Sequence, residues 1–208
     1  MPLAYHFLKD DMTAGSGTEK PWTVGETRRI SGKLTLCVRG YHSCPSPSGA
    51  LKYAQGSVLC LVDVSKPRAS DKTKAVSSRR TLVKAVNVER ELHEVACRIA
   101  EDVLPIFEKQ FPLDKRPRLA IEAKRKWLRG ELDDEGLDAA RDAARDAARD
   151  AARDAAWDAA RAAAWDAARA AAWDAARDAA RDAAWAAAWG KYNDWLDEVL
   201  LAALKAQP

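Results

Sequence analysis

The chain has 208 residues, of which 48% are hydrophobic and 31% are charged, and its formal net charge is +3. This length allows two small domains, each large enough to bury a core. No segment reaches the ~18 apolar residues of a membrane-spanning helix, and the start lacks the apolar run of a signal peptide. Four irregularly spaced cysteines favour reduced thiols. The composition therefore predicts a cytoplasmic protein that does not span a membrane.

The charges are unevenly distributed along the chain. Residues 1–87 contain 14 Lys and Arg against 6 Asp and Glu, whereas residues 88–208 contain 20 against 25. This asymmetry is compatible with docking of the two halves or with an acidic partner for the first half. The hydrophobic patterns change at the same place, so we predict a small α+β domain at 1–87 and an all-helical domain at 88–208. The predicted fold class is α+β.

The first domain shows short strand patterns separated by turn residues. A helix is expected from Ser46-Pro47 to Tyr53, because Pro favours the first helical turn, and Gly40 permits a turn before it. Residues 65–78 are polar and basic, which predicts an exposed loop. Alternating or continuous apolar residues predict strands at 3–9, 33–39, 57–64 and 79–86, with 57–64 suited to the centre of a sheet.

From Val88 the apolar spacing becomes helical. Pro105 is expected to kink the first helix or to start another, Gly130 to end the next, and Asp133 or Asp134 to cap the repeat that follows. The expected apolar faces are Leu92, Val95, Ile99, Val103 and Ile106 in the first helix, Leu119, Ala123 and Trp127 in the second, and Trp195, Leu196, Val199, Leu200 and Leu204 at the C-terminus.

A four-residue repeat, A-A-R/W-D, runs from Leu137 to Gly190. Ala and Arg strongly favour helix, but four residues advance about 400°, so each tetrad is rotated by ~40° from the last. The large side chains cannot form one stripe, and the period predicts right-handed winding rather than a leucine-zipper coiled coil. Local propensity favours one continuous helix, because the repeat contains no turn. A helix pair is the alternative.

Arg and Trp occupy one column of this repeat, and these residue types are enriched at binding hot spots. The alternatives for Trp are core packing, stacking on an external ligand or a nucleic-acid base, and self-association. The alternative for Arg is a solvated face neutralised by Asp. Repeated Asp argues against nucleic acid as the partner, so a protein partner or self-association is expected. The predicted partner-binding residues are Arg153, Trp157, Arg161, Trp165, Arg169 and Trp173.

The first domain contains polar residues that could line a nucleotide pocket, although a structural role is the simpler interpretation of each. A zinc site made by Cys37, His42, Cys44 and Cys60 matches no usual ligand spacing. We predict no catalytic residue, no metal and no cofactor, because the common phosphate-loop and nucleophile motifs are missing. The candidate pocket residues are His6, Tyr41, His42 and Ser43.

Residues 95–136 resemble a helical family of immunity proteins from bacterial polymorphic toxin systems. The family pattern is V-L-x-x-F-E, then P-x-D-x-R-P-R-x-A-I-E-A, then W-x-R-G and alanine-rich helices. The resemblance implies a protein that binds a protein partner, with helices that fold back on each other. The matching residues are Val103, Leu104, Phe107, Glu108, Pro112, Asp114, Arg116, Pro117, Arg118, Ala120, Ile121, Glu122, Ala123, Trp127, Arg129 and Gly130.

The first domain resembles an uncharacterised domain of phage and actinobacterial proteins, through Y-x-F-L at Tyr5, G-Y-H-S-C at Gly40, A-L-x-Y-A at Ala50 and V-L-C-x-V-x-V at Val58. The order of these elements is also similar to the ADP-ribosyltransferase fold. That class requires a Glu after a later strand, and none occurs between Val64 and Glu89.

The sequence therefore predicts a non-enzymatic protein-binding module, of an immunity-like or phage-associated kind, built on an alanine-rich helical scaffold. Self-assembly of that scaffold is one alternative. A nucleotide-binding or ADP-ribosyl-transferring first domain is the other.

Overall fold

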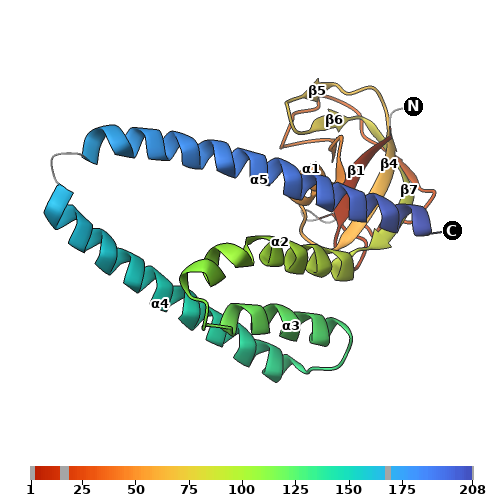
Figure 1. Ribbon diagram of the computed structural model, residues 1–208. Helices are drawn as coiled ribbons and strands as arrows, with labels where there is room; N and C mark the ends of the chain where they lie inside the picture. Colours follow the sequence, from red (N-terminus) through yellow and green to blue (C-terminus); the bar gives the residue numbers. More distant parts are fainter. Residues whose placement is uncertain (1–2, 15–18, 167–169, 208) are drawn as a thin grey trace. The chain divides into compact units, whose positions relative to one another are not determined.

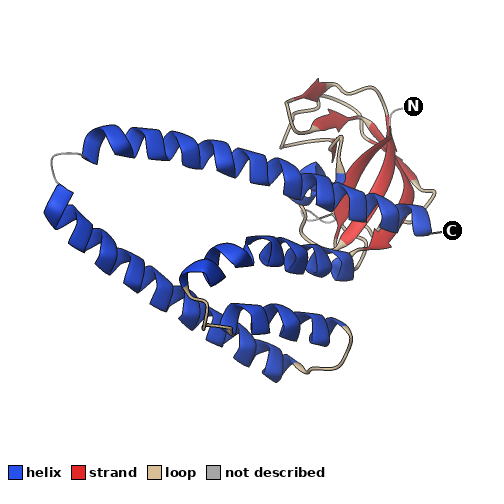
Figure 2. Cartoon of the chain, viewed as in Figure 1, coloured by secondary structure: helices blue, strands red, loops and turns tan. Residues whose placement is uncertain are grey.

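The computed structural model describes residues 3–14, 19–166 and 170–207, with the side chains of 155–185 outside the description. The chain forms two compact units: Met1–Leu92 together with Asn193–Pro208, and His93–Tyr192. The first unit contains two antiparallel sheets, and the second is built from helices (Figures 1 and 2). The predicted α+β class is confirmed.

A four-stranded sheet forms the centre of the first unit. Its strands are β1 (Leu3–Leu8), β4 (Val58–Val64), β7 (Arg79–Asn87) and β2 (Thr27–Arg29), in the order β1-β4-β7-β2. All neighbouring pairs are antiparallel. Three of these strands coincide with the predicted strands at 3–9, 57–64 and 79–86.

A smaller sheet is made by β3 (Tyr41–Ser43), β6 (Ala75–Ser77) and β5 (Ala69–Ser70), in the order β3-β6-β5. The predicted loop at 65–78 is therefore wrong in part, because it contains β5 and β6 and because Val76 is fully buried. The predicted strand at 33–39 is also wrong. Cys37 has φ +65, a left-handed conformation that cannot continue a strand.

Strand β4 is buried on both faces, which explains its continuous apolar sequence. Val62 and its even-numbered neighbours pack with Leu8, Trp22 and Leu82. On the opposite face, Leu59 belongs to a cluster completed by two leucines from the C-terminal end of the chain. The members of this second cluster are Phe7, Cys44, Ala50, Leu59, Val88, Leu200 and Leu204.

The predicted helix after Gly40 is present as α1 (Pro47–Leu51). Ser46 caps it, since the Ser46 hydroxyl accepts a hydrogen bond from the Gly49 amide at 3.1 Å. Gly40 has φ +126, and a Cβ at this position would lie 2.4 Å from a Val76 methyl group. Only glycine fits this turn without displacing β6.

Four longer helices follow: α2 (Glu89–Gln110), α3 (Arg116–Leu128), α4 (Asp134–Asp166) and α5 (Ala170–Ala206). Pro105 lies inside α2 and does not start a new helix. Gly130, with φ +74, follows α3 as predicted. Asp133 caps α4, because its carboxylate accepts a hydrogen bond from the Gly136 amide at 2.9 Å.

The repeat is divided between α4 and α5, and residues 167–169 between them lie outside the described part. The predicted apolar faces hold only in part. Val95 and Ala123 are buried, but the Val103, Ile106 and Leu119 side chains are exposed. Leu104, one position after Val103, is buried in their place. Among the described residues, no helix is long and apolar enough to cross a membrane.

Candidate functional site

In the helical unit, α4 packs against α3 (Figure 1), and most of the buried or half-buried residues of α4 have small side chains. Leu137 and Ala147 are buried, and Ala140, Ala144 and Ala151 are half-buried. The spacing of these residues alternates between three and four. The contact line therefore moves from the second Ala of a tetrad, at Ala140 and Ala144, to the first, at Ala147 and Ala151. The ~40° rotation between tetrads requires this shift. Two alanines per tetrad allow this shift without burying a large or charged side chain.

The opposite side of α4 carries a ladder of ion pairs, which we call the Asp–Arg face. In each pair, an Arg contacts the Asp three residues earlier, at N–O distances of 3.1 to 3.6 Å. All eight side chains are between 49% and 78% exposed. Exposed pairs of this kind add little to stability. Because the side chains are exposed, the face is available for contact. Its members are Asp138, Arg141, Asp142, Arg145, Asp146, Arg149, Asp150 and Arg153.

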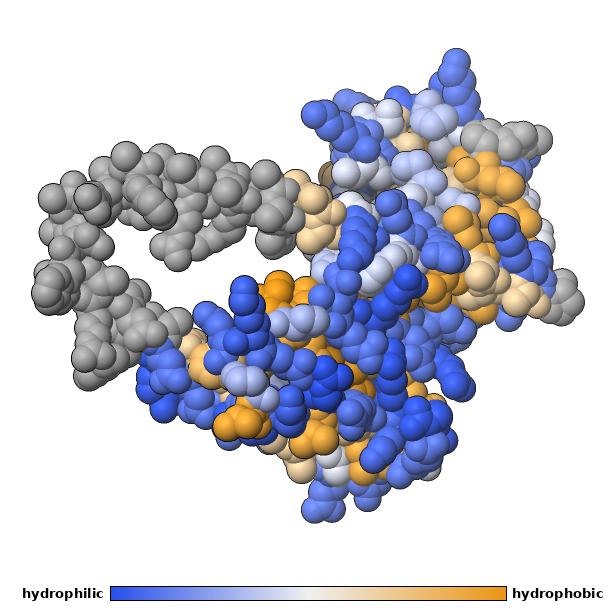
Figure 3. All heavy atoms as spheres, in the orientation of Figure 1, coloured by the Kyte–Doolittle hydropathy of each residue, from blue (hydrophilic) through white to orange (hydrophobic). Residues whose placement is uncertain are grey.

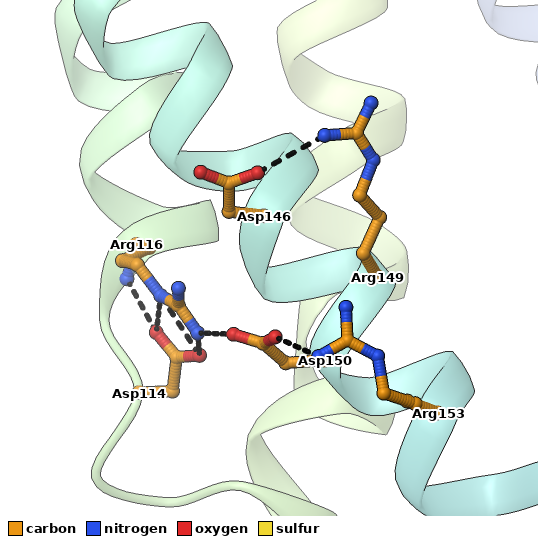
Figure 4. Close-up of polar contacts among 6 residues, drawn as sticks. All are labelled: Asp114, Arg116, Asp146, Arg149, Asp150 and Arg153. Carbon is orange, nitrogen blue, oxygen red and sulfur yellow. Dashed lines mark hydrogen bonds and ion pairs between the residues drawn. The ribbon is translucent and has the colours of Figure 1, made fainter.

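Asp150 also links this face to α3 (Figure 4). The Arg116 guanidinium donates hydrogen bonds to Asp114 at 2.7 Å and to Asp150 at 3.0 Å. Bonding to Asp114, with a further contribution from Asp150, raises the pKa of Arg116, and the pKa of Asp114 is lowered in return. Arg153 contacts the same Asp150 carboxylate from its own helix. Asp150 therefore joins two arginines.

Bidentate ion pairs fix α3 on α2. Arg125 donates to both carboxylate oxygens of Glu101, at 2.6 and 2.9 Å, and Arg118 donates to Glu108 at 2.8 and 2.7 Å. Two parallel bonds set the orientation of a guanidinium as well as its distance. The helical unit is thus held by charged contacts as well as by its small apolar core.

The structure describes only part of the predicted partner site. Arg153 is 78% exposed on the Asp–Arg face. Arg169 lies outside the described residues. The side chains of Trp157, Arg161, Trp165 and Trp173 also lie outside the description.

Apolar side chains add to the exposed surface of the helical unit. Ile106 on α2 is 72% exposed, Leu113 after it is 94% exposed, and Leu119 on α3 is 55% exposed. Figure 3 shows apolar patches among the polar residues of the face in view. Exposed apolar side chains next to charged ones are typical of protein-binding surfaces.

The first unit contains a cavity of about 800 Å³. All four residues of the predicted pocket, His6, Tyr41, His42 and Ser43, line it. They come from β1 and β3, which the bridge between Tyr5 and Cys44 brings together. A volume of this size is in the range of small-molecule sites.

Sequence reasoning missed Arg80, which also lines the cavity and is only 3% exposed. Its guanidinium carbon lies 4.5 Å from the ring centroid of Trp22 and 5.0 Å from that of Tyr41. Burial lowers the pKa of Arg80 to about 10, so the group remains charged at neutral pH. Strand alternation could have revealed it, since Arg80 lies two residues before the buried Leu82 and so shares its face.

The two histidines of the cavity are held in different ways. His42 Nε2 accepts a hydrogen bond from the Cys37 amide at 2.8 Å. His6 Nε2 is buried and has no hydrogen-bond partner in the described structure. Burial, and then the nearby charges of Arg80 and His42, hold the pKa of His6 well below its usual value. Burial also lowers the pKa of His42. Both rings therefore favour the neutral form.

The alternative zinc site is not formed. Cys37 is exposed, whereas Cys44 and Cys60 are buried free thiols. Within the described ranges, no three His, Cys, Asp or Glu side chains are close enough to hold a metal ion.

Comparison with protein families found matches that together span residues 2–199 of the chain. Residues 84–199 match the family described as "Imm-5 like putative immunity protein". This match covers more than half of the chain. The chain belongs to this family.

The family region contains α2, α3, α4 and most of α5, and therefore the whole Asp–Arg face. Residues 2–94 match a domain of unknown function (DUF7666), which includes the sheets and the cavity. The resemblances inferred from the sequence are confirmed for both halves. Searches of curated proteins and of solved structures found no match.

Proposed function

We propose that this protein binds a partner protein in the manner of an immunity protein, and that the Asp–Arg face contributes to the contact. The family match carries this proposal, because it covers the helices that present the face. An immunity role requires recognition of one protein and rejection of others. A dense pattern of both charges is suited to that task, since electrostatic complementarity governs specificity more than affinity.

The packing of α4 supports the choice of this face. One line of residues along α4, Leu137, Ala140, Ala144, Ala147 and Ala151, is buried or half-buried, whereas most Asp and Arg side chains of the helix are exposed. Each Arg lies beside the Asp three residues earlier, so both charges of every pair are on the surface that a partner would contact. The next residues of the same column, Trp157, Arg161, Trp165, Arg169 and Trp173, extend the proposed contact along the repeat.

The test is capture from the native lysate by the tagged full chain at moderate salt, with mass spectrometry of the bound proteins. We expect one protein in stoichiometric amount. The captured protein is then produced separately, and its affinity for the purified chain is measured by calorimetry. Recovery of this chain alone would contradict the proposal and support self-assembly, which light scattering on the purified protein would measure directly.

A matched pair of variants tests the face itself. The first exchanges the charges of two pairs: Asp142→Arg with Arg145→Asp, and Asp146→Arg with Arg149→Asp. It keeps the net charge, the helix and the pairing, but it inverts the surface pattern. We expect at least a tenfold loss of affinity, equivalent to ~1.4 kcal/mol, at an unchanged Tm. Unchanged affinity would exclude this face.

The control variant changes charges elsewhere in the same unit. Exchange of Arg129 and Glu131, which pair after α3 at 2.7 Å, likewise keeps the net charge. We expect it to retain wild-type affinity. An equal loss in both variants would mean that overall charge distribution, rather than the Asp–Arg face, governs binding.

A further inference from the structure

The cavity of the first unit is lined by more positive than negative charge. Arg39, Lys52, Lys74 and Arg80 line it, and Glu19 is the only carboxylate among its described lining residues. Glu19 is already paired, since its carboxylate lies 3.2 Å from Arg28. An anion in the cavity would therefore meet several cations and little opposing charge.

Arg80 is a buried cation without a carboxylate partner among the described residues. Its neighbour Arg28 takes both nearby carboxylates, Glu19 and Glu26, at 3.2 and 2.6 Å. Within the described ranges, Arg80 donates one weak hydrogen bond, to the His42 carbonyl at 3.4 Å, and its guanidinium lies against the rings of Trp22 and Tyr41. A guanidinium has five N–H donors, and a buried charge without a counter-ion is costly. Most of the donor capacity of Arg80 is thus available on the cavity wall.

A second polar atom on the same wall is also unsatisfied. His6 Nε2 is buried and has no hydrogen-bond partner in the described part of the chain, although His6 lines the cavity. Leaving a buried polar atom without a partner is unfavourable. A ligand that reached both Arg80 and His6 from the cavity would satisfy both groups.

We propose that this cavity binds a small phosphorylated organic molecule, with its phosphate against Arg80 and within reach of His6 and Lys74. A phosphate dianion matches the excess of cations better than a single carboxylate does, and it accepts the bidentate bonds that a guanidinium favours. The cavity is much larger than a phosphate ion. The organic part of the ligand lies along the less polar wall, which contains Phe7, Ala50 and Ala54.

The test is calorimetric titration of the full chain with four probes: AMP, ribose 5-phosphate, adenosine and benzoate. We expect saturable binding of AMP and ribose 5-phosphate, and displacement of both by inorganic phosphate. We expect no binding of adenosine, which lacks the charge, and weaker binding of benzoate, a carboxylate. Equal binding of adenosine and AMP, tighter binding of benzoate than of the phosphate esters, or binding of none of the probes would overturn the proposal.

Substitution of Arg80 separates a ligand-binding role from a structural one. Arg80→Met keeps the length of the side chain and removes the buried charge. We expect at least a tenfold loss of phosphate affinity with an unchanged or higher Tm, because a buried charge without a partner is replaced by an apolar group. A lower Tm together with unchanged affinity would show that Arg80 serves the fold alone.

Two further variants complete the test. Lys74→Gln leaves Arg80 in place, so it remains informative if Arg80→Met does not fold; we expect it to weaken phosphate binding several-fold. Arg29→Met removes a charge from the exposed strand β2, outside the cavity, and we expect it to bind as the wild type does. Equal losses of phosphate affinity in Lys74→Gln and Arg29→Met would mean that the net charge of the protein, rather than the cavity, governs binding. That result would contradict the proposed site.

Discussion

Asp197 on α5 binds Ser48 at the start of α1, 149 positions earlier in the chain. One carboxylate oxygen accepts a hydrogen bond from the Ser48 amide at 2.6 Å, and the other accepts one from the Ser48 hydroxyl at 3.0 Å. Amides in the first turn of a helix have no partner within it. Within the first unit, Asp197 therefore ties the C-terminal segment to the start of α1.

Asp197→Asn tests this link. The amide group cannot accept both bonds with a charged oxygen, so we expect the free energy of unfolding to fall by about 1–3 kcal/mol. The measurement is urea denaturation followed by circular dichroism. Asp194→Asn, on the exposed side of the same helix, is the control and should change stability little. Equal changes in the free energy of unfolding for the two substitutions would mean that Asp197 has no special role in stability.

Leu200 is fully buried in the cluster on the odd-numbered face of β4. We expect Leu200→Ala to destabilise the first unit by about 2–5 kcal/mol, because the substitution leaves a cavity in the core. Leu201→Ala, which changes a half-buried neighbour, should cost clearly less. Urea denaturation curves of both variants measure these losses of stability. Similar losses in the two variants would mean that the C-terminal segment does not complete this core.

The first unit should lose stability as the pH falls below about 6.5. Burial, Arg80 and His42 lower the pKa of His6 in the folded state. The unfolded chain therefore binds a proton in a pH range where the folded chain does not, which favours unfolding as the pH falls from ~6.5 towards the folded pKa. His6→Gln removes this titration. Its Tm should depend less on pH between 7 and 5, whereas an unchanged slope would assign the effect to other groups.

The four cysteines should differ sharply in reactivity. Burial raises the pKa of Cys44 to about 11 and that of Cys60 to about 12, and it also raises the pKa of Cys97. Cys37 is exposed. Because the thiolate is the reactive form, we expect Ellman's reagent at pH 8 to modify one thiol per folded chain quickly and all four after unfolding.

Cys37→Ser provides the control for this experiment. The folded variant should show no fast-reacting thiol, while its three remaining cysteines react after unfolding. A second fast thiol in the folded wild type would mean that one of the buried cysteines is accessible.

Much of the local structure was predictable because it depends on neighbours in the sequence. The apolar run of β4, the Ser46 cap, the Asp133 cap and the helical repeat follow from alternation, capping chemistry and helix propensity. The predicted strand at 33–39 failed for the opposite reason. Its alternation was sound, but a tight turn closes between Thr35 and Arg39, where the Cys37 amide donates a hydrogen bond to His42 on β3. Gly40 then approaches Val76 on β6 closely.

The candidate sites show the same limit. His6, Tyr41, His42 and Ser43 were grouped from their types and order, and all four line one cavity. Their role in ligand binding stays a prediction. Arg80 was missed because strand alternation was not applied to its charged side chain. The partner role of the repeat column stays a prediction.

The sequence by itself determined the family, the helix-forming repeat and the apolar faces of the main strands, since these rest on composition and on spacing along the chain. Only the tertiary structure decided that residues 193–208 complete the first unit, that Asp150 reaches Arg116, and that Arg80 is buried without a carboxylate. These features depend on which distant segments meet. Strand alternation indicates which face Arg80 shares with Leu82, but whether a carboxylate lies beside Arg80 depends on segments far away in the sequence, and no local pattern encodes that.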